Sequence, residues 1–203
     1  MSPERLIVFV RAPQEGVVKT RLAATLGASA ALEIYHRLRT THCNNLDALP
    51  PGCVEFRHTP DDGGLLLSPW MRRDWTLQPQ GTGSLGERLE RATAAAFSSG
   101  VQRLVIIGSD CPDLTTTDIH SAWEALHSHD IVLGPAEDGG YWAIGLRAPT
   151  LEVFRDIPWS TDSVMEKTLE RCRTYKLSIR TLRCLRDVDT QADWEAWIRR
   201  AAP

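Results

Sequence analysis

The sequence predicts an α/β protein with a parallel β-sheet whose central strands are covered on both faces. Two short apolar runs, at residues 6–10 and 104–107, carry this prediction, because neither alternates with polar residues as a half-exposed strand would. Segments with helical spacing separate the candidate strands along the chain. The 203 residues suffice for one substantial core and are few for two, so we expect a single domain over residues 1–203.

Composition and charge narrow the class of protein. The hydrophobic fraction of 42% and the charged fraction of 24% are those of an ordinary globular protein. A net charge of -3 provides no basic surface, which argues against a nucleic-acid partner and a polybasic membrane anchor. No apolar run is long enough for a membrane span. Five scattered cysteines without metal-ligand spacing favour a reducing, cytoplasmic setting.

The first expected strand, residues 6–10, leads into a basic loop at residues 11–21. A loop with three cations and a glycine after a strand suits an anionic ligand such as phosphate. It is not a Walker A loop, because no glycine directly precedes Lys19. The alternative is a solvated basic loop. The residues that would meet the anion are Arg11, Gly16, Lys19 and Arg21.

The next segment has apolar residues at helical spacing and predicts a helix over residues 28–49, which ends before a Pro-Pro-Gly sequence. His36 and His42 in this helix are interpreted as ordinary face residues. Residues 53–59 predict a second strand, and residues 75–77 predict a short one.

A glycine-rich stretch at residues 78–88 precedes an expected helix over residues 85–98. A flexible loop at a helix N-terminus can approach a nucleotide through its backbone amides. The alternative is a turn in which Ser84 caps the helix and Glu87 completes a capping box. The residues at this junction are Gly83, Ser84 and Leu85.

The strand at residues 104–107 ends at a Gly-Ser pair and delivers Asp110 to its carboxyl end. Ligands of open α/β sheets bind at that edge, so Asp110 is a candidate metal ligand or catalytic group. One of the threonines at residues 115–117 is expected to cap a helix over residues 118–127. Cys111 is interpreted as a buried structural thiol, because the motif contains no histidine that could activate it.

A second candidate site lies in the loop at residues 134–140, between strands expected at residues 130–133 and 141–146. Two acids and two consecutive glycines would let a ligand rest against the backbone while a carboxylate faces it. An acidic hairpin turn is the equally weighted alternative. The four residues are Glu137, Asp138, Gly139 and Gly140.

The C-terminal part predicts a helix over residues 162–174, capped by Ser160 or Thr161, and a strand over residues 176–182. Two acids follow at alternate positions, Asp187 and Asp189, and a terminal helix starts at Thr190. Either acid could supply a second carboxylate to a metal at Asp110, and the alternative is a helix cap.

Six segments together resemble a family of bacterial proteins known as type A glycosyltransferases, and more distantly the 2-phospho-lactate and molybdopterin-cofactor guanylyltransferases. The segments are FVRAPQEGVVKTRL, GTGSLGERL, GSDCPDL, GPAEDGGYWAIGL, PWST and DVDT. The resemblance covers Leu6 to about Trp194. It implies the nucleotide-diphospho-sugar transferase fold, a three-layer α/β/α sandwich with a mostly parallel, mixed sheet.

The resemblance also implies roles for the candidate residues. Arg11, Gly16, Lys19 and Arg21 match a phosphate loop, although this loop lacks the glycine-rich pattern of typical nucleotidyltransferases. Gly83, Ser84 and Leu85 match the region that meets the base, and Glu137 to Gly140 match the acceptor pocket. Asp110 matches the metal-binding aspartate, and Asp189, ahead of Asp187, matches the late acid that completes the site.

The implied chemistry is a metal-dependent transfer from a nucleotide-activated donor to a small-molecule acceptor. Two carboxylates with open coordination positions suit Mg²⁺ or Mn²⁺, and Lys19 would stabilise the leaving phosphate. Asp138 or Glu137 is the candidate base for an inverting sugar transfer. Glycosyl transfer is preferred; the alternatives are a nucleotidylyltransferase that releases pyrophosphate and a nucleotide-binding module without catalysis. An exposed tryptophan such as Trp70 would suit an acceptor surface or a homodimer contact.

Overall fold

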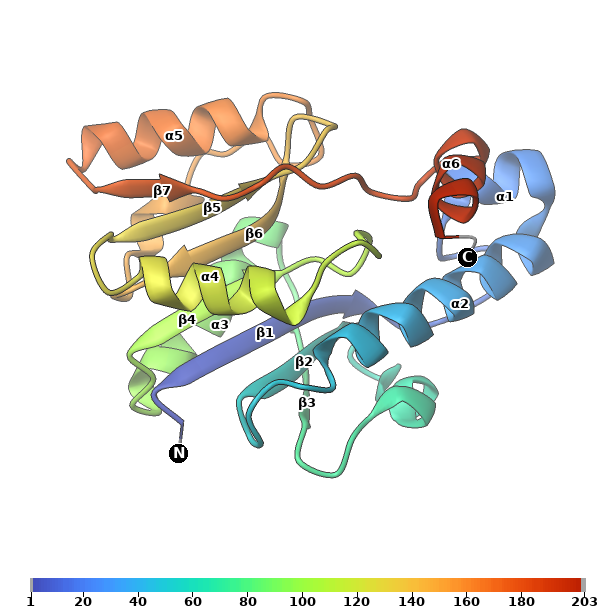
Figure 1. Cartoon of the computed structure of the whole chain (residues 1–203), viewed down its shortest axis with the longest axis horizontal. Helices are drawn as coiled ribbons and strands as arrows, with labels where there is room; N and C mark the ends of the chain where they lie inside the picture. The colour runs from blue at the N-terminus through green and yellow to red at the C-terminus, as the bar shows by residue number, and fades with distance from the viewer. Residues whose placement is uncertain (1, 202–203) are drawn as a thin grey trace.

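The computed structural model describes residues 2–201, which form a seven-stranded mixed sheet covered by helices (Figure 1). The strand order is β3-β2-β1-β4-β6-β5-β7. β6 runs antiparallel to β4 and β5, and all other neighbouring strands are parallel. The strands are β1 (Glu4–Arg11), β2 (Val54–Thr59), β3 (Thr76–Pro79), β4 (Arg103–Ile107), β5 (Ile131–Pro135), β6 (Tyr141–Leu146) and β7 (Ile179–Thr181).

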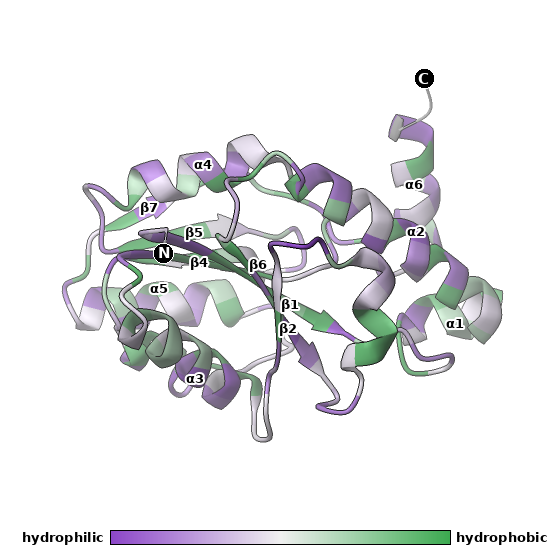
Figure 2. Ribbon diagram, turned by 90° about the horizontal axis from the view of Figure 1, so that it is seen from below, coloured by the Kyte–Doolittle hydropathy of each residue, from purple (hydrophilic) through white to green (hydrophobic). Residues whose placement is uncertain are grey.

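Helices cover both faces of the sheet, which confirms the predicted α/β/α sandwich. Figure 2 shows α2 and α4 on one side of the strands and α3 and α5 on the other. The α-helices are α1 (Thr20–Leu26), α2 (Ala28–Leu46), α3 (Leu85–Ser98), α4 (Thr116–Ala125), α5 (Val164–Thr174) and α6 (Gln191–Ala201). Short 3-10 helices cover η1 (Gly64–Trp70) and η2 (Leu151–Phe154).

The two hydrophobic cores explain the absence of polar alternation in the central strands. Val105 and Ile107 of β4 pack into the core beneath α2 and α4. Leu104 and Ile106 pack into the opposite core with α3 and α5. Successive side chains of a strand point to opposite faces, so a strand covered on both faces needs apolar residues at every position.

A third, smaller core packs the last helix against two helices from the first quarter of the chain. It brings α1, α2 and α6 together beyond the carboxyl end of β1, and Figure 1 shows α1 and α6 side by side there. Its buried residues are Leu22, Ala31, Ile34, Leu38, Val188 and Trp197. This core fixes the loop that precedes α1 and the segment that precedes α6.

The strand directions bring the predicted site segments to one edge of the sheet. All strands except β6 point the same way, so the loops after β1, β3, β4, β5 and β7 share the carboxyl edge. The candidate residues of the sequence lie in these five loops or at the helix and strand ends that border them. This is the edge at which ligands bind in open α/β sheets.

Several predicted element bounds are wrong. The first long helix ends at Leu46, not at residue 49, and a separate helix, α1, begins inside the predicted basic loop. The last strand has three residues instead of the predicted seven. Lys176 has a positive φ of 56°, which is incompatible with an extended strand at that position.

Two of the predicted helix caps are confirmed and one is wrong. The side chains of Ser84 and Thr115 cap α3 and α4, each within a capping box. Ser163, not Ser160 or Thr161, occupies the N-cap of α5, without a side-chain cap hydrogen bond. The Thr161 hydroxyl instead donates to the carbonyl of Pro158, at 2.7 Å.

Candidate functional site

Lys19 lies at the centre of the candidate site. Its ammonium donates to Oδ1 of Asp110, after β4, and at 3.0 Å to Oδ1 of Asp189, between β7 and α6. The Lys19 side chain is only 4% exposed, whereas the two carboxylates are 45% and 38% exposed. Arg21 adds a weaker contact, with its Nη1 3.9 Å from Oδ2 of Asp189. The structure thus brings two acids that are distant in the sequence to Lys19 and its neighbour Arg21.

The pKa values of Lys19 and Asp110 are shifted by burial and by each other's charge. Burial alone would lower the pKa of Lys19, but the charges of Asp110 and Asp189 raise it above its ordinary value. Burial likewise acts to raise the pKa of Asp110, yet the ammonium of Lys19 holds it below its usual range. Both directions favour the charged forms of Lys19 and Asp110.

Hydrogen bonds to backbone carbonyls stabilise the loop before Lys19. Gly16, at a φ of 75°, supports the turn in which the amide of Val17 donates to Gln14, at 3.1 Å. The Arg11 guanidinium donates to the carbonyl of Val17, at 3.2 Å, and the Tyr35 hydroxyl donates to the carbonyl of Arg11. Arg11 is thus part of the loop's framework in this structure.

Asp187 has different partners from Asp189. Its Oδ1 accepts a hydrogen bond from the thiol of Cys111, at 2.6 Å. Burial raises the pKa of Asp187 to about 6; the bond from Cys111 acts against this shift, and the nearby carboxylates add to it. Burial also raises the pKa of the Cys111 thiol, which makes it a poor nucleophile. Of the two acids, Asp189 is therefore the one that shares a cation with Asp110.

The loop between β5 and β6 is a hairpin connection, closed by a bond from the amide of Ala136 to the carbonyl of Gly140, at 3.1 Å. Glu137 forms an ion pair with Arg186, at 2.6 Å, whereas Oδ1 of Asp138 accepts the amide of Gly140, at 2.9 Å. Neither carboxylate is hydrogen-bonded to the Lys19 cluster. Asp138 nevertheless lies close enough to raise the pKa of Asp187, behind the larger effect of burial.

The Gly139 backbone fits closely against the start of α5. Its φ is 88°, and a Cβ at this position would lie 2.1 Å from the carbonyl oxygen of Asp162. Its carbonyl accepts the amide of Met165, at 2.9 Å. The expected acceptor loop is thus fixed by β5 and β6, which flank it, and by the contact of Gly139 with the start of α5.

The glycine loop before α3 is anchored beside β1. The buried Gln80 donates to the carbonyls of Val10 and Arg57, at 3.3 and 3.0 Å. The amide and the hydroxyl of Ser84 are both engaged with Glu87, at 2.7 and 2.9 Å. Ser84 is therefore occupied as a helix cap, and the structure brings no hydrogen bond from Gly83, Ser84 or Leu85 to the Lys19 cluster.

Sequence reasoning missed a polar face of α2 behind Asp110. Arg39 is 2% exposed, lies 5.2 Å from the ring centre of Tyr35, and has no hydrogen-bond partner for Nε or Nη1. His42 is also buried, so its interpretation as an ordinary face residue is wrong; neither ring nitrogen has a partner. Burial lowers the pKa of His42 to about 3. The spacing of residues 35, 39 and 42 on one helix face was the available signal.

Arg39 contributes to the electrostatics of the site without an ion pair. After the effects of burial and of Lys19, its charge also lowers the pKa of Asp110. Trp70, expected to be exposed, is partly buried and donates to the hydroxyl of Thr40, at 3.1 Å. This tryptophan packs against α2.

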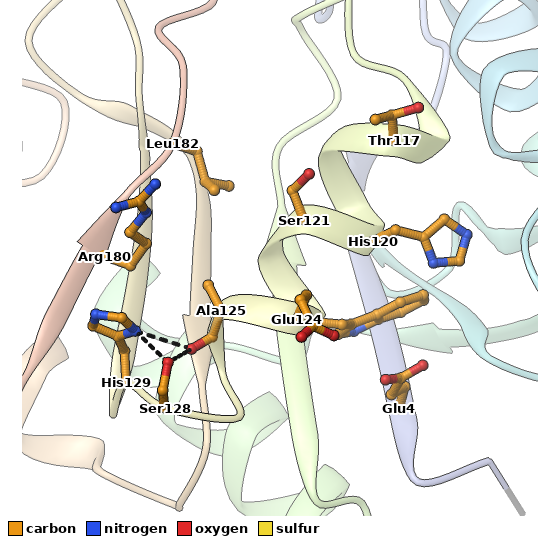
Figure 3. A pocket seen from close by; sticks show the side chains of 11 residues that line it. Glu4, Thr117, His120, Ser121, Glu124, Ala125, Ser128, His129, Arg180 and Leu182 are labelled. Atoms are coloured by element: carbon orange, nitrogen blue, oxygen red, sulfur yellow. Dashed lines mark hydrogen bonds between the residues drawn. The ribbon is translucent and has the colours of Figure 1, made fainter.

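A cavity between α4 and β7 lies away from these residues. It has a volume of about 640 Å³, with His120, Glu124 and Arg180 among its lining residues (Figure 3). None of the predicted site residues lines it. The case for the edge at Lys19 therefore rests on its charged groups and not on this cavity.

The donor set at this edge fits a small divalent cation. Within residues 2–201, no group of three or more His, Cys, Asp or Glu side chains is arranged to hold a metal ion. Two carboxylates that share one ammonium are nevertheless within reach of one cation, and Mg²⁺ commonly uses one or two carboxylates plus waters and phosphate oxygens. Over the same range, no helix combines the length and the apolar character needed to cross a bilayer.

Comparison with solved structures places this fold among known ones. A provisionally assigned nucleotide-diphospho-sugar transferase from Desulfovibrio desulfuricans G20 is 32% identical, with a TM-score of 0.92 over 100% of this chain and 89% of that chain. A cytidylyltransferase from Leptospira borgpetersenii serovar Hardjo-bovis (strain JB197) is 12% identical, with a TM-score of 0.62 over 97% and 85% of the two chains. Rv0371C from Mycobacterium tuberculosis H37Rv, in complex with manganese, is 13% identical, with a TM-score of 0.53 over 96% and 98%.

These structures differ in what they establish. The two more distant ones share the fold alone, and the sequence matches no curated protein. The fold is that of the nucleotide-diphospho-sugar transferases, as the resemblance implied. Residues 43–161 match the family described as "Uncharacterized protein conserved in bacteria (DUF2064)". With more than half of its length matched, the chain belongs to this DUF2064 family.

Proposed function

We propose that the protein is a nucleotide-using transferase whose site is the carboxyl edge around Lys19. The observation that carries the proposal is the contact of one buried ammonium with Asp110 and Asp189. Such a cluster offers a cation to donor phosphates and two hard carboxylates to a divalent ion. The similarity to a provisionally assigned nucleotide-diphospho-sugar transferase supports the same class.

Asp110 and Asp189 are the residues that would hold Mg²⁺ or Mn²⁺. The complex of Rv0371C with manganese supports such a role within the shared fold. When bound, the ion would neutralise charge on the phosphates of the donor. The chain's own contribution would come from Lys19, which would stabilise the charge that develops on the leaving phosphate, and from Arg21, which lies beside it.

Glycosyl transfer is the preferred form of the reaction, and Asp138 is the proposed base. Its Oδ1 is held by the amide of Gly140, whereas Glu137 is tied to Arg186, at 2.6 Å. In this reaction the acceptor oxygen bonds to the sugar carbon, its proton passes to the Asp138 carboxylate, and the nucleoside diphosphate leaves with the bonding electrons. The ion pair makes Glu137 the weaker candidate.

Nucleotidyl transfer is the second candidate, favoured by the buried position of Lys19 in a basic loop. Here the acceptor oxygen attacks the α-phosphorus of a nucleoside triphosphate and pyrophosphate leaves. Positioning and cationic charge supply most of the catalysis in phosphoryl transfer, so no dedicated base is required. The similarity to a cytidylyltransferase concerns the fold and is compatible with either reaction.

A thermal-unfolding screen with Mn²⁺ tests the proposal against nucleoside triphosphates and nucleotide-diphospho-sugars. A ligand at about 100 times its Kd stabilises by about 2.7 kcal/mol, which raises the melting temperature of a chain of this size by roughly 5–10 °C. A shift with a sugar nucleotide supports glycosyl transfer, and a shift with one triphosphate supports nucleotidyl transfer. No shift with any nucleotide would contradict the proposed class.

Matched variants locate the binding. Asp110→Asn should abolish the metal-dependent shift but retain the fold, because the change is nearly isosteric. Asp62→Asn is the control, since Asp62 is an exposed loop acid. Lys19→Ala should weaken nucleoside diphosphates more than nucleosides. Equal losses for both ligands would remove the phosphate role of Lys19.

A further inference from the structure

Lys19 occupies the position that a divalent cation would need. The ammonium donates to Oδ1 of Asp110 and, at 3.0 Å, to Oδ1 of Asp189, so one oxygen of each proposed metal ligand is already hydrogen-bonded to Lys19. An ammonium and a metal ion cannot occupy the same space. A divalent ion that uses both of these Oδ1 atoms must therefore displace Lys19.

The surroundings of Lys19 make this displacement costly. The side chain is 4% exposed, and the residue has a left-handed conformation (φ 49°, ψ 49°) at the N-cap of α1. Charge-assisted hydrogen bonds of this kind contribute more than neutral ones, and a buried ammonium without them is strongly disfavoured. Lys19 will leave the carboxylates readily only when another anion receives it.

We propose that Lys19 acts as a built-in substitute cation, which keeps the metal site closed until donor phosphates arrive and accept the ammonium. This inference rests on the proposed function, because it assigns Asp110 and Asp189 to the metal and Lys19 to the phosphates. By linkage, metal and nucleotide then strengthen each other's binding by the same factor. The metal alone binds weakly, since it must displace the ammonium without compensation.

Binding of Mn²⁺ in the absence of nucleotide tests this directly, with the free ion followed by electron paramagnetic resonance. Lys19→Met removes the ammonium and replaces the lysine by an unbranched side chain, so the backbone strain of the left-handed conformation is the same in both proteins. It should bind Mn²⁺ at least about tenfold more tightly than the parent, the effect of losing one charge-assisted hydrogen bond. Lys167→Met is the control, because Lys167 pairs only with Glu170 on the surface of α5.

Arg21→Met separates occupation of the site from a general loss of positive charge. The Arg21 side chain is 74% exposed and its Nη1 lies 3.9 Å from Asp189, outside the position between the two carboxylates. We expect it to tighten Mn²⁺ binding much less than Lys19→Met does. An equal effect of both variants, or no gain in Lys19→Met, would overturn the proposal.

Amine acetylation gives a second readout that is independent of activity. The sequence contains three lysines, at positions 19, 167 and 176, and the last two are exposed. Lys19 should react far more slowly than the others in the metal-free protein, and saturating Mn²⁺ should increase the reaction of Lys19 alone. If Mn²⁺ binds and the acetylation of Lys19 does not change, the ammonium was not displaced and the proposal fails.

The two proposals fail in distinguishable ways. If no nucleotide stabilises the protein but Lys19→Met still tightens Mn²⁺ binding, the substitute-cation role stands and the transferase proposal does not. If nucleotides bind and Lys19→Met leaves the Mn²⁺ affinity unchanged, the transferase proposal stands alone.

Discussion

Replacement of Gly139 by alanine tests the close packing of the expected acceptor loop. Gly139 has a φ of 88°, a conformation that costs a residue with a Cβ about 1–2 kcal/mol. The new Cβ would also lie 2.1 Å from the carbonyl oxygen of Asp162, where real contacts stay beyond 3.0 Å. The backbone at the start of α5 must therefore move by roughly an ångström, and such overpacking costs about 1–3 kcal/mol.

Together these effects predict a loss of about 3 kcal/mol in the free energy of unfolding. For a chain of this length, the melting temperature should fall by roughly 6–12 °C. Urea unfolding followed by tryptophan fluorescence measures the loss, and an unchanged m-value would show that the unfolded state is the same. The backbone of Asp162 is the group that must give way, because a carbonyl cannot rotate aside as a side chain can.

Gly140→Ala is the matched control in the same loop. Its added Cβ would meet only Oδ1 of Asp138, at 3.1 Å, at the end of a flexible side chain. The expected loss is below about 0.5 kcal/mol, as for ordinary surface substitutions. If Gly139→Ala and Gly140→Ala unfold at the same urea concentration, the left-handed turn against α5 is not formed and the reasoning is refuted.

Three further predictions concern buried polar groups and helix caps. Because burial lowers the pKa of His42 to about 3, only the unfolded chain gains a proton there as the pH falls, so stability should drop by about 2 kcal/mol from pH 7 to pH 5. Urea unfolding at both pH values should show this drop reduced in His42→Leu and retained in the exposed-site control His127→Gln. Arg39→Met should raise the melting temperature, because it removes a buried cation whose Nε and Nη1 have no hydrogen-bond partner and keeps an apolar side chain in its place. A lower melting temperature would show that these nitrogen atoms do have partners. Ser84→Ala and Thr115→Ala should each cost about 1 kcal/mol in thermal unfolding. Because the Ser84 hydroxyl is engaged with Glu87, both variants should keep the nucleotide affinity of the parent, and a loss in Ser84→Ala alone would show that Ser84 also meets the nucleotide.

The sheet and its functional edge could be predicted because both follow from local patterns. The unbroken apolar run before Asp110 indicated a strand covered on both faces, and the strand ends then fixed where the candidate loops meet. The capping box at Ser84 was visible for the same reason, since it is a spacing within four consecutive residues, whereas the cap of α4 was narrowed only to one of three threonines. The orientation of β6 was left open: the apolar pattern of a strand is the same in either direction, and only the hairpin alternative for residues 134–140 predicted the antiparallel arrangement that the structure has.

The details of the site depended on contacts that no local pattern encodes. The left-handed conformation of Lys19 and its burial between two carboxylates come from tertiary packing around α1. Arg39 would be expected at the surface of a helix, because arginine is rarely buried without a partner. The different surroundings of Asp187 and Asp189 could not be predicted either, because the Cys111 thiol that donates to Asp187 lies 76 residues away in the sequence.

The position of Lys19 has a consequence for the order in which the molecule assembles. Its two partners lie 91 and 170 residues further along the chain. Contacts across such separations form only after long loops have closed, and synthesis proceeds from the N-terminus. A nascent chain therefore emerges with its basic loop uncompensated and gains Asp110 after β4 and Asp189 only after β7. We expect the charge cluster to be completed last, on a sheet that has already formed.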